Sequence, residues 1–110
     1  MPPIDVLMSM IDKENLLLGK SSIIHGDLIL DNIIETSDKY FLIDWRQDFG
    51  ENLTVGDLYY DLAKLNHNLI FNHFLVKSGN FRTEEQNNKT KCDILVSKNL
   101  IDCRHVLHKF

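Results

Sequence analysis

The segment spanning residues 22–50 constrains the fold of this 110-residue chain more than any other. Its apolar runs are short, polar turns separate them, and they lie at residues 23–24, 33–34 and 40–43. This pattern predicts a strand, a loop, a second strand, a turn and a third strand. Asp27, Asn32 and Asp44 fall at the ends of these strands. Because rigid strands hold such loop residues in place, we expect the chemistry of the protein here.

The order of polar residues in this segment matches a phosphoryl-transfer site. His25, Asp27 and Asn32 follow the pattern H-x-D-x-x-x-x-N, and an apolar strand then ends on Asp44. Phosphoryl transfer from ATP requires Mg²⁺ and a carboxylate that orients the attacking hydroxyl group. One carboxylate and one amide oxygen, completed by phosphates and water, suit Mg²⁺. The alternative is that these residues merely cap strands and turns, as Asp and Asn often do.

Three ordered motifs carry a family resemblance. They are HGDLILDN at 25–32, FLIDW at 41–45 and GDLYYDLAKL at 56–65. Together they resemble the aminoglycoside phosphotransferase and choline kinase family, and their wording is similar to that of phosphotransferases encoded with bacterial capsule or surface-sugar genes. The resemblance covers roughly residues 22–75. Gly26, where protein kinases usually carry Arg, favours this branch over protein kinases.

The resemblance implies a role for each matching residue. Asp27 would be the catalytic base, while Asn32 and Asp44 would hold Mg²⁺ and, through it, the nucleotide. His25 would brace the catalytic loop, and Asp61 would support the same loop from a helix. The implied activity is transfer of a phosphoryl group from ATP, or GTP, to a hydroxyl group of a sugar, choline or an aminoglycoside-like molecule. The implied fold is α+β, a partial C-terminal lobe of a protein-kinase-like fold with helices around a small catalytic sheet of β-hairpin type.

The letters D-F-G at residues 48–50 offer a second candidate for the metal ligand. In kinases the metal-binding Asp directly follows a short apolar strand. Asp44 does so here, whereas Asp48 follows the polar pair Arg46-Gln47. We therefore predict that Asp44, rather than Asp48, is the ligand.

Length and composition limit the remaining functions. Residues 1–110 make at most one domain, and we treat them as a single partial domain. The net charge of −4 gives no sign of a nucleic-acid partner. The sequence has neither an apolar run of membrane-spanning length nor the features of a signal peptide, so we expect a cytoplasmic protein.

The N-terminal part of the sequence is too short for the smaller lobe of a kinase. Only about twenty residues precede the catalytic loop, and no glycine-rich phosphate-binding motif occurs. We therefore expect the chain to need a missing N-lobe partner, or to self-associate through exposed apolar faces.

Apolar periodicity and turn residues predict the elements outside the central segment. Residues 4–11 have the spacing of a helix that packs in a core. Steps of three and four predict one long helix at about 57–75, ended by Lys77, Ser78 and Gly79. Residues 80–97 alternate around two asparagines and predict a β-hairpin, and a further amphipathic helix starts within 98–110.

The two cysteines, Cys92 and Cys103, are too few for a disulfide framework. A zinc site would combine them with His105 and His108, but this spacing fits no compact tetrahedral site. We expect reduced, buried cysteines that pack as small apolar side chains.

Two functions from different classes remain open. The first is the phosphotransferase described above, acting on a small-molecule alcohol. The second is a truncated, non-catalytic kinase-like fragment or binding module that needs a missing N-lobe. A protein kinase ranks third, because the sequence carries no A-P-E segment.

Overall fold

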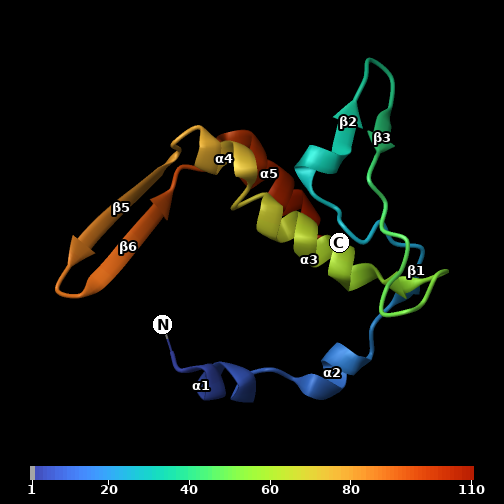
Figure 1. The fold of residues 1–110 in the computed structure, drawn as a ribbon, viewed down its shortest axis with the longest axis horizontal. Helices are drawn as coiled ribbons and strands as arrows, with labels where there is room; N and C mark the ends of the chain where they lie inside the picture. The colour runs from blue at the N-terminus through green and yellow to red at the C-terminus, as the bar shows by residue number, and fades with distance from the viewer. Residues whose placement is uncertain (1) are drawn as a thin grey trace.

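The computed structural model describes residues 2–110, in which short helices alternate with three two-stranded antiparallel sheets (Figure 1). This mixture fits the predicted α+β class. The elements are α1 (Ile4–Ser9), α2 (Lys13–Leu17), β1 (Ser21–Ser22), a 3₁₀ helix (Leu30–Asn32), β2 (Ile33–Glu35), β3 (Tyr40–Leu42), β4 (Gly56–Asp57), α3 (Leu58–Asn68), α4 (His73–Lys77), β5 (Phe81–Gln86), β6 (Lys89–Ile94) and α5 (Lys98–Leu107).

The N-terminal segment differs from the predicted core helix. Helix α1 ends at Ser9, and α2 begins after Asp12, whose carboxylate accepts a hydrogen bond from the Asn15 amide at 3.1 Å. This N-cap starts a second helix shortly after α1 ends. Neither α1 nor α2 contains a buried residue, so the prediction that residues 4–11 pack in a core is wrong.

Two small sheets frame the central segment. Strands β2 and β3 form the hairpin expected around residues 35–39, with Ile33 opposite Leu42. Strand β1 pairs with β4, although 33 residues separate them in the sequence, and β1 precedes the predicted strand at residues 23–24. A side chain added at Gly56 would meet the Ile24 side chain at 2.3 Å, so Ile24 packs closely on β4 instead of extending the ladder.

The long helix predicted at 57–75 is two helices. Helix α3 ends at Asn68, and α4 starts after Asn72, whose backbone is extended. The Asn72 side chain accepts a hydrogen bond from the Leu75 amide at 2.9 Å and donates one to the Asn68 carbonyl at 3.0 Å. Apolar spacing continues across this break, so periodicity alone missed it, whereas an asparagine N-cap explains it.

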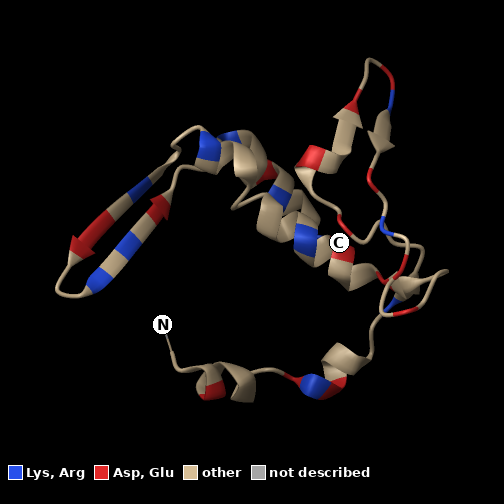
Figure 2. Ribbon diagram, viewed as in Figure 1, with Lys and Arg blue, Asp and Glu red and all other residues tan. Residues whose placement is uncertain are grey.

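Strands β5 and β6 form a hairpin that projects from the helices (Figure 1). Asn87 and Asn88 both have positive φ, which is the geometry of a tight two-residue hairpin turn. One face carries opposite charges across the strands, Arg82 against Asp93 and Glu84 against Lys91, as the charge colouring of Figure 2 shows. Every residue of β5 is exposed.

Helix α5 lies within the predicted 98–110 range, against α3. Arg104 on α5 and His108, directly after that helix, both bond the Asn66 side-chain oxygen, at 3.1 and 2.9 Å. Cys92 and Cys103 are exposed free thiols, so the prediction of buried cysteines is wrong. Within residues 2–110, none of the helices is long and apolar enough to cross a membrane.

Very little apolar surface is buried. Among residues 2–110, the buried apolar side chains are Leu69 and Leu75. The radius of gyration is 17.0 Å, whereas a compact domain of this size would have about 13 Å. Large apolar side chains are exposed on every part of the chain, including Leu17, Ile23, Leu53 and Phe74. Exposed apolar area on this scale is typical of surfaces that bind another molecule or that promote aggregation.

We predict that the isolated chain self-associates, because apolar surface removed from water favours association. Size-exclusion chromatography with light scattering should show a mass above 12.8 kDa that rises with concentration. A constant monomer mass at all concentrations would contradict this prediction.

Candidate active site

The loop that precedes the 3₁₀ helix is attached to α3 through one buried carboxylate. Asp61, in the first turn of α3, is 4% exposed. Its two oxygens accept hydrogen bonds from the backbone amides of His25 at 2.6 Å and Gly26 at 2.9 Å. Hydrogen bonds to an ionised carboxylate are stronger than neutral ones. Helix α3 therefore fixes the backbone immediately before Asp27.

His25 connects this loop to the strand that leads to Asp44. The ring is buried, and Nε2 lies 2.7 Å from the Ile43 carbonyl oxygen. Because a carbonyl oxygen can only accept, Nε2 carries the proton. Nδ1 then accepts from the Asp27 amide at 3.3 Å. The Trp45 ring packs on His25 with 4.8 Å between centroids, and Trp45 stays half exposed.

Gly26 is required by two features of the turn. Its φ is +80°, a conformation that side chains disfavour. A Cβ at this position would also lie 2.7 Å from Cβ of Arg46. The Arg46 amide donates to the His25 carbonyl at 2.9 Å, so the two loops run in direct contact here. An Arg, as protein kinases usually have after the histidine, would clash in this turn.

Asp27 sits among cations and hydrogen-bond donors. Lys64 of α3 forms an ion pair with one of its oxygens, and Asn32 Nδ2 lies 3.4 Å from the other. The Lys64 hydrogen bond, with the positive charges of Lys64 and Arg46, holds the pKa of Asp27 below its ordinary value of 3.8, although partial burial opposes this shift. Asp27 is therefore ionised at neutral pH and can accept a hydrogen bond from a hydroxyl group.

Asn32 and Asp44 are brought together by the backbone. Asn32 Nδ2 donates to the Asp27 carbonyl at 2.9 Å, which leaves its side-chain oxygen free for another partner. The Asn32 carbonyl accepts from the amide of Ile43, next to Asp44, at 3.0 Å. Asp44 adopts φ of +60°, so the chain turns sharply as β3 ends. The conformation costs about 1–3 kcal/mol for a non-glycine residue and occurs often at functional sites.

Asp27, Asp44 and Asp48 line one open cavity together with Arg46. Within residues 2–110, no three His, Cys, Asp or Glu side chains form a group that could hold a metal ion by themselves. The Asn32 amide oxygen and the Asp44 carboxylate, which the sequence predicts as ligands, are both hard oxygen donors. This set fits Mg²⁺, which takes its remaining ligands from phosphates and water, better than a metal held by protein alone.

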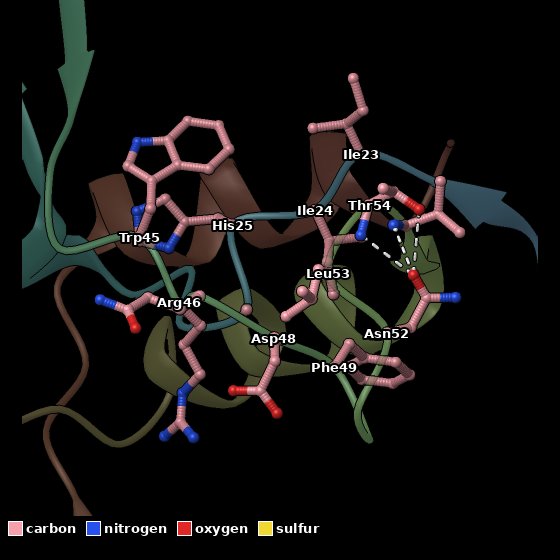
Figure 3. Close-up of a pocket in the computed structure, with 13 residues that line it drawn as sticks. Ile23, Ile24, His25, Trp45, Arg46, Asp48, Phe49, Asn52, Leu53 and Thr54 are labelled. Carbon is pink, nitrogen blue, oxygen red and sulfur yellow. Dashed lines mark hydrogen bonds between the residues drawn. The ribbon is translucent and has the colours of Figure 1, made fainter.

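Asp48 lies farther along the loop than Asp44. Figure 3 shows its carboxylate and the Arg46 side chain pointing to the same side of a second cavity of about 180 Å³. Residues 52–55 line this cavity as well, and the Asn52 side chain accepts from the amides of Thr54 and Val55 at 3.0 and 3.1 Å. Asp44 and Asp48 both border the cavity that Asp27 lines.

Sequence reasoning missed two residues of this network, Lys64 and Asn68. Asn68 accepts a hydrogen bond from the Leu30 amide at 2.9 Å and so supports the start of the 3₁₀ helix. Asp61, Lys64 and Asn68 are spaced three and four residues apart, which places them on one face of α3. A polar stripe within an otherwise apolar helix pattern was the signal that could have found them.

We predict that Asp61→Ala lowers the free energy of unfolding by about 3 kcal/mol, because two buried amides lose a charged acceptor. Asp57→Ala is the matched control, since Asp57 caps the same helix by accepting from the Tyr59 amide at 3.0 Å. That loss should be about 1 kcal/mol. Urea unfolding measures both changes, and equal losses would contradict a special role for Asp61.

We further predict that Lys64→Met raises the pKa of Asp27 towards its ordinary value. A carboxyl with a lowered pKa stabilises the fold above its ordinary pKa, and this contribution disappears as pH falls through the lowered value. Carbon NMR of the Asp carboxyl groups measures the titration. Lys91→Met removes the same charge from an exposed pair with Asp93 and should leave Asp27 unchanged. An unchanged Asp27 in Lys64→Met would exclude the ion pair.

One of the comparisons with known proteins identifies a family. The phosphotransferase enzyme family matches residues 5–76, a range that contains Asp27, Asn32, Asp44 and Asp61. No curated protein and no solved structure matches the chain. Because the family match spans more than half of the 110 residues, the chain belongs to the phosphotransferase enzyme family.

Proposed function

We propose that this chain is part of the C-terminal lobe of a kinase-like phosphotransferase, which moves a phosphoryl group from ATP or GTP to a hydroxyl group of a small molecule. One observation carries the proposal: an ionised Asp27, held by Lys64 and Asn32, faces the same cavity as Asp44. Family membership supports phosphotransfer in general. The similarity of the motifs to phosphotransferases of capsule or surface-sugar gene clusters favours a sugar over choline or an aminoglycoside.

In this proposal Asp27 orients the acceptor hydroxyl group. The hydroxyl oxygen attacks the terminal phosphorus atom, the bond from that phosphorus to the nucleoside diphosphate oxygen breaks, and the hydroxyl proton passes to Asp27. The lowered pKa of Asp27 suits a group that aligns the hydroxyl and takes the proton late. His25 and Asp61 act through the backbone, because their hydrogen bonds fix the residues on either side of the turn.

Asn32 and Asp44 would hold Mg²⁺, which neutralises the charge of the phosphates when bound. Arg46 borders the same cavity and adds a positive charge there. The elements that cradle the nucleotide phosphates in kinases have no counterpart among the sequence motifs of this chain. We propose that another polypeptide segment supplies them.

The alternative function is that of a non-catalytic kinase-like fragment or binding module. The exposed apolar side chains favour it, because two buried apolar residues make a weak core for an independent enzyme. In that case the polar network would preserve a binding surface without turnover.

Calorimetric titration of Mg-ATP into the chain tests the proposal. We predict binding that is lost in Asp44→Ala and kept in Asp48→Ala, because Asp44 follows the strand end tied to Asn32. Phosphate transfer to a sugar should be lost in Asp27→Ala without loss of Mg-ATP binding. Binding that depends on Asp48 alone would overturn the metal assignment, and Mg-ATP binding without any transfer would favour the non-catalytic alternative.

A further inference from the structure

A cavity of about 550 Å³ opens beside Asp27 on the α3 side of the catalytic loop. Its volume is in the range of small-molecule binding sites. Tyr60 and Lys64 of α3 line it, and Phe71 and His73 line it beyond the end of that helix. Any hydroxyl group that reaches Asp27 from this side therefore belongs to a molecule that occupies the cavity. This cavity is distinct from the one that Asp27 shares with Asp44.

The features that would attract a cationic molecule are already engaged by Lys64. Of the described residues that line the cavity, Asp27 is the one with a carboxylate, and Lys64 is paired with it. The Lys64 ammonium also lies 5.8 Å from the centre of the Tyr60 ring, within reach of a cation–π contact. The Lys64 ammonium would therefore repel a second ammonium group both at the Asp27 carboxylate and at the Tyr60 ring.

The remaining polar groups at this cavity favour an anion. Lys64 is a third exposed and has three hydrogen-bond donors, so it can bond Asp27 and a ligand oxygen together. His67 and His73 add two further ring nitrogens each. The Asp31 carboxylate lies 3.9 Å from His73 Nδ1 and adds negative charge near that residue, but Asp31 does not line the cavity. The half-exposed Phe71 ring offers a flat apolar face for a sugar ring.

We infer that the acceptor of this phosphotransferase is a sugar that carries an anionic group, carboxylate or phosphate, and that Lys64 selects it against cationic acceptors. The inference rests on the proposed function for its reaction, and it concerns binding of the acceptor alone. Lys64 acts here as a specificity residue. Its ammonium binds the anionic group of the sugar. Because the same ammonium is paired with Asp27, the bound sugar has a hydroxyl group near the Asp27 carboxylate.

Four sugars that share one ring and differ in charge test the inference. They are glucuronate, glucose 6-phosphate, glucose and glucosamine, each titrated into the nitrogen-labelled chain and followed by NMR shifts of α3 amides. We expect at least one anionic sugar to bind about tenfold more tightly than glucose, and glucosamine to bind most weakly. A factor of ten corresponds to about 1.4 kcal/mol, the size expected for one charge-assisted contact. The two anionic arms distinguish a carboxylate from a phosphate.

Lys64→Met should abolish the preference for the anionic sugar, and Lys64→Arg should keep most of it. Lys91→Met, which removes an equal charge from the projecting hairpin, should change nothing (Figure 2). Amide spectra show whether each variant stays folded, and Lys64→Arg decides the matter where Lys64→Met does not fold. Equal affinities for all four sugars, tighter binding of glucosamine, or no binding of any sugar would overturn the inference. Because nucleotide is absent, these outcomes are independent of the Mg-ATP titration.

Discussion

The buried Asp61 carboxylate is the contact on which the rest of the site depends. It joins the first turn of α3 to the backbone of His25 and Gly26, across 35 residues of sequence. Leaving two buried amides without their charged acceptor costs far more free energy than the two hydrogen bonds contribute when they form. The fold therefore strongly disfavours the loss of this contact. The His25 ring bonds the Ile43 carbonyl, and the Ile43 amide donates to the Asn32 carbonyl. Both residues therefore hold the backbone just after β3. The position of Asp44 follows from this sequence of hydrogen bonds.

Polar contacts rather than apolar packing therefore hold the site. Few side chains are fully buried in residues 2–110, and most of those are polar, including His25, Asn32, Asp61 and Asn68. Each of these polar side chains has a hydrogen-bond partner. Such a network is directional and fixes geometry well, but it contributes little net stability. The exposed apolar faces around so small a core are candidates for contact with another protein segment.

Local features were predictable from the sequence, whereas features that depend on distant contacts were not. The hairpin turn at Asn87-Asn88 was predictable because asparagine tolerates positive φ. The β2–β3 hairpin was predictable because two short apolar runs flank a polar turn. The break at Asn72 was hidden because the apolar period continues through it. The same limit applied to the site: the Asp27 and Asn32 spacing was visible in the sequence, but the Lys64 contact depends on how α3 packs against the loop.

Lys64 gives the proposed reaction a constraint that the motif alone does not. A lone carboxylate beside bound phosphates would be repelled by them and would favour its protonated form. The Lys64 ammonium lines a different cavity from Asp44, so it would counter this repulsion and favour the ionised form of Asp27 without lining the cavity that Asp44 shares with Asp27. The same ammonium faces the cavity from which an acceptor would approach. In the proposed reaction, the Lys64 charge would therefore affect both the ionisation of Asp27 and the charge of the acceptor that binds.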